Sequence, residues 1–119
     1  MRNRSTYEKG KHAEDLAVMF LEGKGLRILA RNYRYARGEI DVVAEENGEI
    51  VFVEVKARHS SEFGAPEEAI SDEKKEQIYS VAEYYLSEYN IENRPCRFDL
   101  VAIQFHKNSE EISHIKNAF

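Results

Sequence analysis

Three charged side chains interrupt two apolar runs in the middle of the sequence: Asp41, Glu54 and Lys56. The runs are separated by Asn47 and Gly48, the pair most typical of a two-residue type I′ hairpin turn. Such a turn would place Asp41 directly opposite Glu54, where like charges destabilise a sheet. A divalent cation would remove that repulsion, and oxygen ligands suit Mg²⁺ or Mn²⁺. The sequence therefore predicts a metal site, with Lys56 on the same face to steer a phosphate or an attacking water.

The same register predicts one buried face for the hairpin. Ile40, Val42, Val53 and Val55 would form a wholly apolar side. Charged residues on half-exposed strands usually face solvent, which is the simpler interpretation of the acid pair. The metal-site interpretation is favoured because an acid pair in register, a lysine on the same face and apolar neighbours coincide.

Two helical patterns flank the strands of this hairpin. Apolar residues at helical spacing predict one helix over residues 13–21 and another over residues 78–89. Ser71 or Asp72 would supply the N-cap of the second helix. Glu14 lies at the edge of the first apolar stripe, so its carboxylate can lean toward the rim of the surface that this helix covers.

Strands are expected on both sides of the second helix. Residues 26–35 form a β-branched and aromatic run before the hairpin, residues 96–105 read as a strand, and residues 111–119 read as a weaker edge strand. The order is then helix, three strands, helix and two strands. This alternation predicts an α/β fold with helices flanking a central mixed sheet.

The chain is expected to form a single domain over residues 1–119, with residues 1–6 as a flexible extension. No apolar run is long enough to span a membrane, and the first residues lack the apolar core of a signal peptide, so a cytoplasmic protein is expected. The lone cysteine can form no internal disulfide, and the four histidines lack zinc-ligand spacing. The sequence contains no phosphate-binding loop or nucleophile-elbow motif.

Basic residues gather in two stretches of a chain whose net charge is −5. Residues 1–12 carry more cations than acids, and residues 24–37 carry five cations and no acid. Two such stretches on an acidic body predict local binding of an anionic ligand. Ordinary solvated charge is the alternative.

The first expected strand interleaves arginine with tyrosine. Arg31, Tyr33, Tyr35 and Arg37 would lie on one side of this strand and Arg34 on the other. Such a pattern suits phosphate contact and base stacking, and it suits an ordinary edge strand as well.

The acid pair and the lysine on consecutive strands, after a helix with an inward glutamate, resemble the PD-(D/E)XK nuclease superfamily. The chain more closely resembles the YraN family, small bacterial proteins of unsettled function regarded as relatives of archaeal Holliday-junction resolvases. The segments that carry this likeness cover nearly the whole chain: KGKHAEDLA, RNYRYARGEIDVVAEENGEIVFVEVKAR, FGAPEEAI, RFDLVAI and HIKNAF. The resemblance implies a restriction-endonuclease-like fold with an α-β-β-β-α-β core.

By this resemblance, Asp41 and Glu54 would bind the metal, Mg²⁺ or Mn²⁺, with the backbone carbonyl of Val55 as a further ligand. Lys56 would orient the nucleophilic water or offset charge in the transition state. Glu14 would complete the acidic cluster through a metal-bound water. The implied partner is nucleic acid, and DNA in particular, with predicted contacts from Arg31, Tyr33, Arg34, Arg37 and Arg58. Secondary candidates are Glu39, Lys74, Gln77 and Asp99.

The function expected from these residues is metal-dependent hydrolysis of DNA phosphodiester bonds, with branched DNA among the candidate substrates. Two alternatives stay open: a non-catalytic nucleic-acid-binding module, and a protein adaptor that uses the tyrosine-rich second helix. One active site per chain would need two chains to cut two strands symmetrically, so a homodimer is a further expectation.

Overall fold

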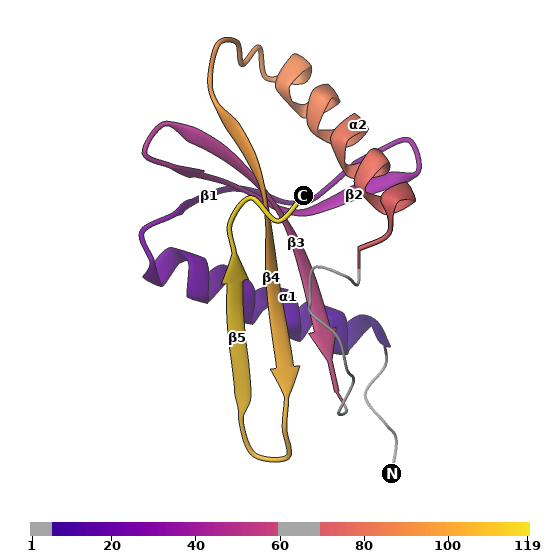
Figure 1. The fold of residues 1–119 in the computed structure, drawn as a ribbon, viewed down its shortest axis with the longest axis vertical. Helices are drawn as coiled ribbons and strands as arrows, with labels where there is room; N and C mark the ends of the chain where they lie inside the picture. Colours follow the sequence, from indigo (N-terminus) through magenta and orange to yellow (C-terminus); the bar gives the residue numbers. More distant parts are fainter. Residues whose placement is uncertain (1–5, 60–69) are drawn as a thin grey trace.

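The computed structural model describes residues 6–59 and 70–119, and for residues 6–9 it describes the backbone alone. A five-stranded sheet carries one helix on each face (Figure 1). In chain order the elements are α1 (Thr6–Gly23), β1 (Arg27–Tyr35), β2 (Gly38–Glu46), β3 (Glu49–Arg58), α2 (Asp72–Glu88), β4 (Cys96–Phe105) and β5 (Glu110–Ile115). The α-β-β-β-α-β order and the mixed sheet expected of a restriction-endonuclease-like fold are confirmed, with β5 added after them.

Two predicted features lie outside the described residues. One is the flexible extension expected at residues 1–6, of which only residue 6 is described. The other is the segment FGAPEEAI at residues 63–70, of which only residue 70 is described. Within residues 6–59 and 70–119, neither helix combines the length and the apolar character needed to cross a lipid bilayer.

The strands are ordered β1-β2-β3-β4-β5, so β1 and β5 form the edges of the sheet. Neighbouring strands are antiparallel except β3 and β4, which are parallel and are connected through α2. In Figure 1, β1 and β2 run across the upper part of the molecule, whereas β3, β4 and β5 run together toward its lower end. β2 and β3 therefore diverge as the sheet twists.

The hairpin between β2 and β3 has the predicted turn. Asn47 and Gly48 have φ values of 49° and 85°, as a type I′ turn requires. Paired residues run back from the turn as far as Val42 and Val53, where the β2–β3 ladder ends. The predicted register is confirmed up to that pair, and beyond it the two strands separate.

Each face of the sheet has its own buried core. Toward α1 the core is mainly aliphatic and includes Ala17, Leu21, Val42, Val51 and Val53. Toward α2 it contains larger and aromatic side chains, including Ile40, Val43, Phe52, Ile78 and Tyr85. Because both faces are covered, a charged residue in the central strands needs a specific partner to offset its burial.

The alternation of side chains along β2 is interrupted at Asp41. Ile40 packs with Val43 in the α2-side core, whereas Val42 packs in the α1-side core. The prediction that Ile40 and Val42 share one apolar face is therefore wrong. Asn32 of the neighbouring β1 lies beside this point with a φ of 52°, a left-handed conformation that redirects the strand.

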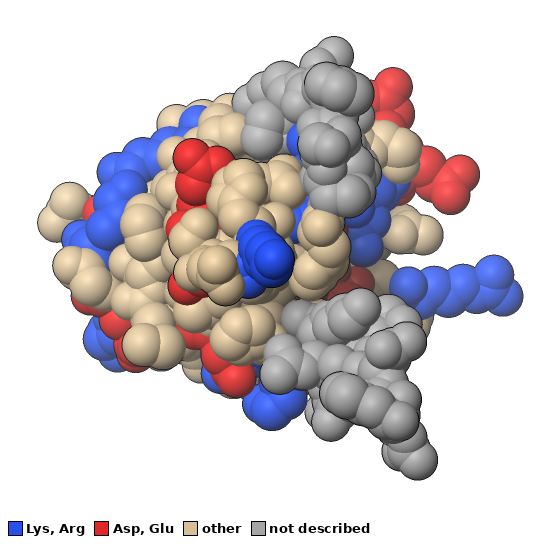
Figure 2. All heavy atoms as spheres, turned by 90° about the horizontal axis from the view of Figure 1, so that it is seen from below, with Lys and Arg blue, Asp and Glu red and all other residues tan. Residues whose placement is uncertain are grey.

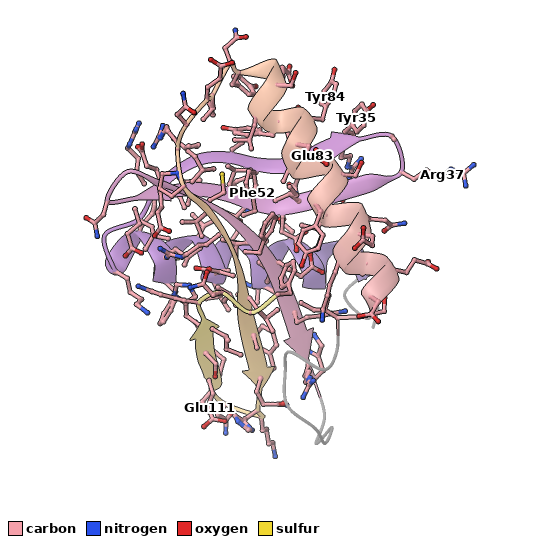
Figure 3. All side chains as sticks on the ribbon, turned by 45° about the horizontal axis from the view of Figure 1, so that its top comes forward. Tyr35, Arg37, Phe52, Glu83, Tyr84 and Glu111 are labelled. Atoms are coloured by element: carbon pink, nitrogen blue, oxygen red, sulfur yellow. The ribbon has the colours of Figure 1, made fainter. Side chains whose placement is uncertain are left out.

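The same interruption divides the arginine and tyrosine residues of β1. Arg31 bonds to α1, whereas Tyr33 and Tyr35 pack against α2. The ring centroids of Tyr33 and Tyr85 lie 5.0 Å apart. Those of Tyr35 and Tyr84, which Figure 3 labels, lie 3.9 Å apart. The predicted alternation on one side of the strand is wrong, because the left-handed residue after Arg31 turns the following side chains to the other face.

Gly38, the first residue of β2, lets the β1–β2 hairpin pack closely against α2. A Cβ atom at this position would lie 2.6 Å from Val81 Cγ2 and 3.4 Å from the backbone oxygen of Gln77. Val81 is buried, and its branched side chain has little rotamer freedom to yield. Hairpin and helix are thus joined by a contact that leaves no room for a side chain.

Gly38→Ala is predicted to destabilise the fold by about 1 to 3 kcal/mol, because the added methyl group overpacks the contact with α2. Urea unfolding followed by circular dichroism would measure the loss. Gly23→Ala is the matched control, since a Cβ atom at Gly23 meets nothing within 4 Å and alanine favours the helix. A Gly38→Ala protein as stable as the wild type would contradict the close contact.

Candidate functional site

Asp41 and Glu54 meet where β2 separates from β3. Asp41 Oδ2 accepts a hydrogen bond of 2.8 Å from the backbone N–H of Val55, the residue after Glu54. The two carboxyl groups also hydrogen-bond to each other. The predicted encounter of the two carboxyl groups is therefore present, but it lies beyond the last ladder pair and depends on the side chain of Asp41 reaching across to β3.

Burial dominates the electrostatics of this pair. It raises the pKa of Asp41 to about 8, and the charge of Glu54 adds to the rise. Burial also raises the pKa of Glu54, of which 6% is exposed, while Lys74, the hydrogen bond with Asp41 and Lys56 act in the opposite direction. A proton shared by the pair removes the repulsion, so without another cation the two carboxyl groups hold one proton near neutral pH.

Two lysines lie next to the pair. Lys56 follows Glu54 by two residues on β3, and its charge favours the ionised form of that carboxyl. Lys74 is in the first turn of α2, and its Nζ lies 3.9 Å from Glu54 Oε2. Ser71 fixes the start of this helix, because its side chain accepts a hydrogen bond of 3.1 Å from the backbone N–H of Lys74.

A cavity of about 420 Å³ opens on the α1 side of this position. Its wall is built by α1 and by the parts of β1, β2 and β3 nearest to it, and its polar lining residues are Lys11, Glu14, Asn32, Arg34, Glu39 and Asp41. Asp41 thus belongs both to the cavity wall and to the carboxyl pair. Glu54 instead has Lys74 of α2 beside it.

Glu14 points inward as predicted, but other residues hold its carboxylate. One oxygen accepts a hydrogen bond of 2.9 Å from Arg31 Nε, and the other accepts one of 2.5 Å from Asn32 Nδ2. Arg31 also bonds to Asp15, and Asn32 also donates to Glu39. Glu14 therefore lines the same cavity as Asp41 without joining the carboxyl pair, and its predicted place beside a metal-bound water stays a prediction.

Asn32 and Asp15 are site residues that sequence analysis missed. Asn32 connects two acids of the cavity wall, and Asp15 shares Arg31 with Glu14. The signal for Asn32 was available, because asparagine is enriched at left-handed backbone positions and this one interrupts a β-branched and aromatic strand. Asp15 carried no such signal, since an acid on an exposed helix face is ordinary.

The carboxyl pair fits a hard divalent cation. In the described part of the chain, no group of three or more His, Cys, Asp or Glu side chains is arranged around one metal position. Mg²⁺ is commonly held by one or two carboxylates, with water and phosphate oxygens completing its shell. Asp41 and Glu54 supply that number of oxygen-donor groups, and a cation would replace the proton that their contact requires.

The arginines of the basic stretch are largely paired with acids. Arg34 Nε lies 3.4 Å from Glu39 Oε1, and Arg27 pairs with Glu45. Arg31 is held by the acids of α1. The local positive charge predicted from residues 24–37 is therefore offset in large part within the protein.

The other predicted nucleic-acid contacts lie at different places around the sheet. Arg37 lies in the β1–β2 turn, and its side chain extends away from the body of the protein (Figure 3). Tyr33 is half-buried, with its hydroxyl donating to Glu88 at the end of α2. Arg58 is half-buried at the end of β3, where its backbone oxygen accepts a hydrogen bond from Gln104. These residues thus come from β1, from the β1–β2 turn and from the end of β3.

Asp99, a secondary candidate, belongs to a buried structural network. Its carboxylate accepts hydrogen bonds from Arg97, from His114 and from the backbone N–H of Asn117. Burial alone would raise the pKa of Asp99, but the hydrogen bonds from His114 and Arg97 outweigh it and hold that pKa below its usual value. The network joins β4 to β5 and to the residues after it.

Residues 13–103 match the sequence profile described as "Uncharacterised protein family UPF0102". A UPF0102 protein of Clostridioides difficile is 45% identical over 112 residues, which cover 94% of this chain and 96% of that protein. A UPF0102 protein of Persephonella marina is 46% identical over 111 residues, covering 93% and 92% of the two chains.

The chain belongs to family UPF0102. This confirms the resemblance to the YraN family inferred from the sequence. Among solved structures, the chain is similar to SfsA of Pyrococcus furiosus, determined in complex with Ca²⁺, with 14% identity and a TM-score of 0.37. That alignment covers 94% of this chain and 64% of SfsA, so the UPF0102 chain spans less than two thirds of that protein.

In this UPF0102 chain, the carboxyl pair predicts a fall in stability with rising pH. The folded pKa of Asp41 is above its unfolded value, so the folded state keeps a proton that the unfolded state releases, and stability is lost as pH rises toward 8. Without divalent ions, we expect the free energy of unfolding to fall by on the order of 2 to 4 kcal/mol between pH 5 and pH 8.

Urea unfolding across this pH range would test the expectation. Asp41→Asn should flatten the pH dependence and raise the stability at pH 8, because a neutral amide needs no shared proton. Asp72→Asn is the control, since Asp72 is fully exposed at the start of α2. An Asp41→Asn protein with the wild-type slope would show that the pair does not hold the proton.

Proposed function

We propose that this chain is a metal-dependent nuclease that hydrolyses phosphodiester bonds in DNA. Mg²⁺ or Mn²⁺ would be held by Asp41, Glu54 and the backbone carbonyl of Val55. The observation that carries the proposal is the buried, hydrogen-bonded carboxyl pair, with Lys56 and Lys74 beside Glu54 and with Asp41 in the wall of a cavity. Packing alone gives no reason to bury two acids in contact, because their repulsion weakens the fold unless they bind a positive charge.

When bound, the cation would offset phosphate charge and make a coordinated water more acidic. The residues of the chain have separate tasks in the proposed reaction. Lys56 orients the attacking water. As the oxygen of that water bonds to phosphorus, the water releases one proton to solvent, the bond to the leaving oxygen breaks, and the leaving oxygen takes up a proton. Lys11 lines the cavity and holds the phosphate by charge. Arg31 and Asn32 keep Glu14 fixed in the cavity wall.

The resemblance to the YraN family supports DNA, and branched DNA among its forms, as the substrate. Cutting two strands symmetrically would require two copies of the single site, so a homodimer forms part of the proposal.

A non-catalytic nucleic-acid-binding protein is the second candidate. The observation that favours it is the engagement of both Glu14 oxygens by Arg31 and Asn32, which leaves the acidic group with two members in contact. Binding of DNA without cleavage would support this candidate.

A divalent ion is predicted to stabilise the wild-type protein, because the ion binds the folded carboxyl pair and not the unfolded chain. A thermal melt with Mn²⁺ at pH 7.5 should show a raised Tm at ion concentrations above the Kd. Asp41→Asn and Glu54→Gln should lose this shift. Glu83→Gln, an exposed acid on α2 (Figure 3), should keep it. An undiminished shift in both pair variants would place the ion elsewhere.

Nuclease activity is predicted in a screen of branched, flapped and linear DNA with Mn²⁺. Glu54→Gln and Lys56→Ala should lower the cleavage rate by at least about a hundredfold while the far-UV spectrum stays unchanged, since each removes a group acting on the reacting phosphate or water. Lys75→Ala, which removes a lysine paired with Asp72, should cleave like the wild type. Wild-type protein that cuts none of these DNAs would overturn the proposal.

A further inference from the structure

A second cavity, of about 460 Å³, lies at the end of the molecule where β3 and β4 finish. Its lining residues come from α1, from the residue that follows β3, from the end of β4 and from the β4–β5 turn, and include His12, His59, Phe105, Lys107, Asn108 and Ser109. Figure 2 looks onto this end, where uncharged residues occupy much of the face and acidic and basic side chains are scattered among them. Among the described residues that line the cavity, Lys107 is the one lysine or arginine.

Three stacked rings form the aromatic part of this cavity. His59 lies parallel to Phe105, with ring centroids 4.8 Å apart and an angle of 6° between the rings. His12 of α1 stacks on the same phenyl ring at 5.8 Å and 30°. Both imidazoles are exposed and Phe105 is half-buried, so flat ring faces are presented at the surface. Ring pairs at these separations are favourable, and a further planar ring can extend such a stack.

The chemistry of the cavity fits a planar heteroaromatic ligand better than a metal or an apolar one. Within residues 6–59 and 70–119, its histidines form no group of three suited to a metal ion, and His106 is bonded to Glu111. Lys107, Asn108 and Ser109 add polar groups next to the stacked rings. An aromatic surface with hydrogen-bonding groups at its edge is how proteins bind single unpaired bases.

The two cavities are neighbours. Lys11 lines the cavity of the candidate metal centre, and His12, the next residue of α1, lines the second cavity. Ala57 of β3 lines the first cavity, and His59, the residue that follows β3, lines the second. A nucleic-acid strand with one phosphate in the first cavity could therefore place a nearby base in the second.

We infer that the second cavity binds one unpaired nucleobase, which extends the stack formed by the rings of His12, Phe105 and His59. The inference rests on the proposed function, which gives nucleic acid as the substrate. It narrows that substrate to nucleic acid with an unpaired nucleotide next to the scissile phosphate. A base held in a duplex is stacked and paired on its own strand and cannot enter the cavity without being extruded.

Proton NMR of the histidine rings would test base binding without any cleavage. Adenosine 5′-monophosphate, added without divalent ions up to millimolar concentration, should shift the ring resonances of His12 and His59 through the ring current of the base. Ribose 5-phosphate should not produce these shifts. His114, whose side chain is 1% exposed, serves as the internal control. No shift, or equal shifts with ribose 5-phosphate, would overturn the inference.

Binding of oligonucleotides to the metal-free protein provides the second measurement. His59→Ala and Phe105→Leu should each weaken binding of a single-stranded oligonucleotide by about tenfold, and leave duplex binding unchanged, because each removes a stacking surface. Tyr84→Leu is the matched control, since Tyr84 is an exposed aromatic residue on α2. His59→Ala decides the outcome if Phe105→Leu fails to fold.

The failure of this inference differs from failure of the proposed function. If DNA is cut but both ring variants bind single strands like the wild type, base stacking is wrong and the nuclease assignment stands. If no DNA is cut and adenosine 5′-monophosphate still shifts His12 and His59, the nuclease assignment fails and the base site stands.

Discussion

Two carboxyl groups in contact inside a protein need a proton or a cation between them, and the contact of Asp41 with Glu54 sets this requirement at the centre of the sheet. It arises because β2 leaves β3 after the Val42–Val53 pair while Asp41 stays bonded to the backbone of β3. The separation of the strands leaves space around the side chains of Asp41 and Glu54. The hydrogen bond from the backbone of Val55 nevertheless keeps Asp41 beside Glu54. The chemistry of the site follows from that geometry.

Much of the remaining structure holds this arrangement in place. Gly38 allows the β1–β2 hairpin to pack closely against α2. The Ser71 cap fixes the first residue of that helix, and Lys74 therefore lies beside Glu54. On the other face, Arg31 and Glu14 tie β1 to α1 across the cavity. The two helices therefore fix opposite sides of the same diverging strands, and neither ties the two carboxyl groups to each other directly.

The local sequence pattern predicted the hairpin well. Asn47 and Gly48 indicate a two-residue turn, and such a turn allows only one register for the two strands. It failed where one residue departs from strand geometry. Asn32 adopts a left-handed conformation, which assigns Arg31 and Tyr33 to opposite faces and moves Ile40 out of the expected core. Alternation cannot show such a departure, since it assumes that every residue extends the strand.

The sequence also could not predict which residues would pair with the charged side chains. Glu14 was correctly predicted to point inward, but its bonds to β1 depend on how the first helix lies across the sheet.

The distances in sequence between contacts also imply an order of folding. Asp41 and Val55 are close along the chain, whereas β3 pairs with β4 only after α2 has crossed the sheet, and such long-range parallel pairing forms slowly. The acidic contact can thus form early, and the parallel strand that completes the sheet around it sets the pace of folding.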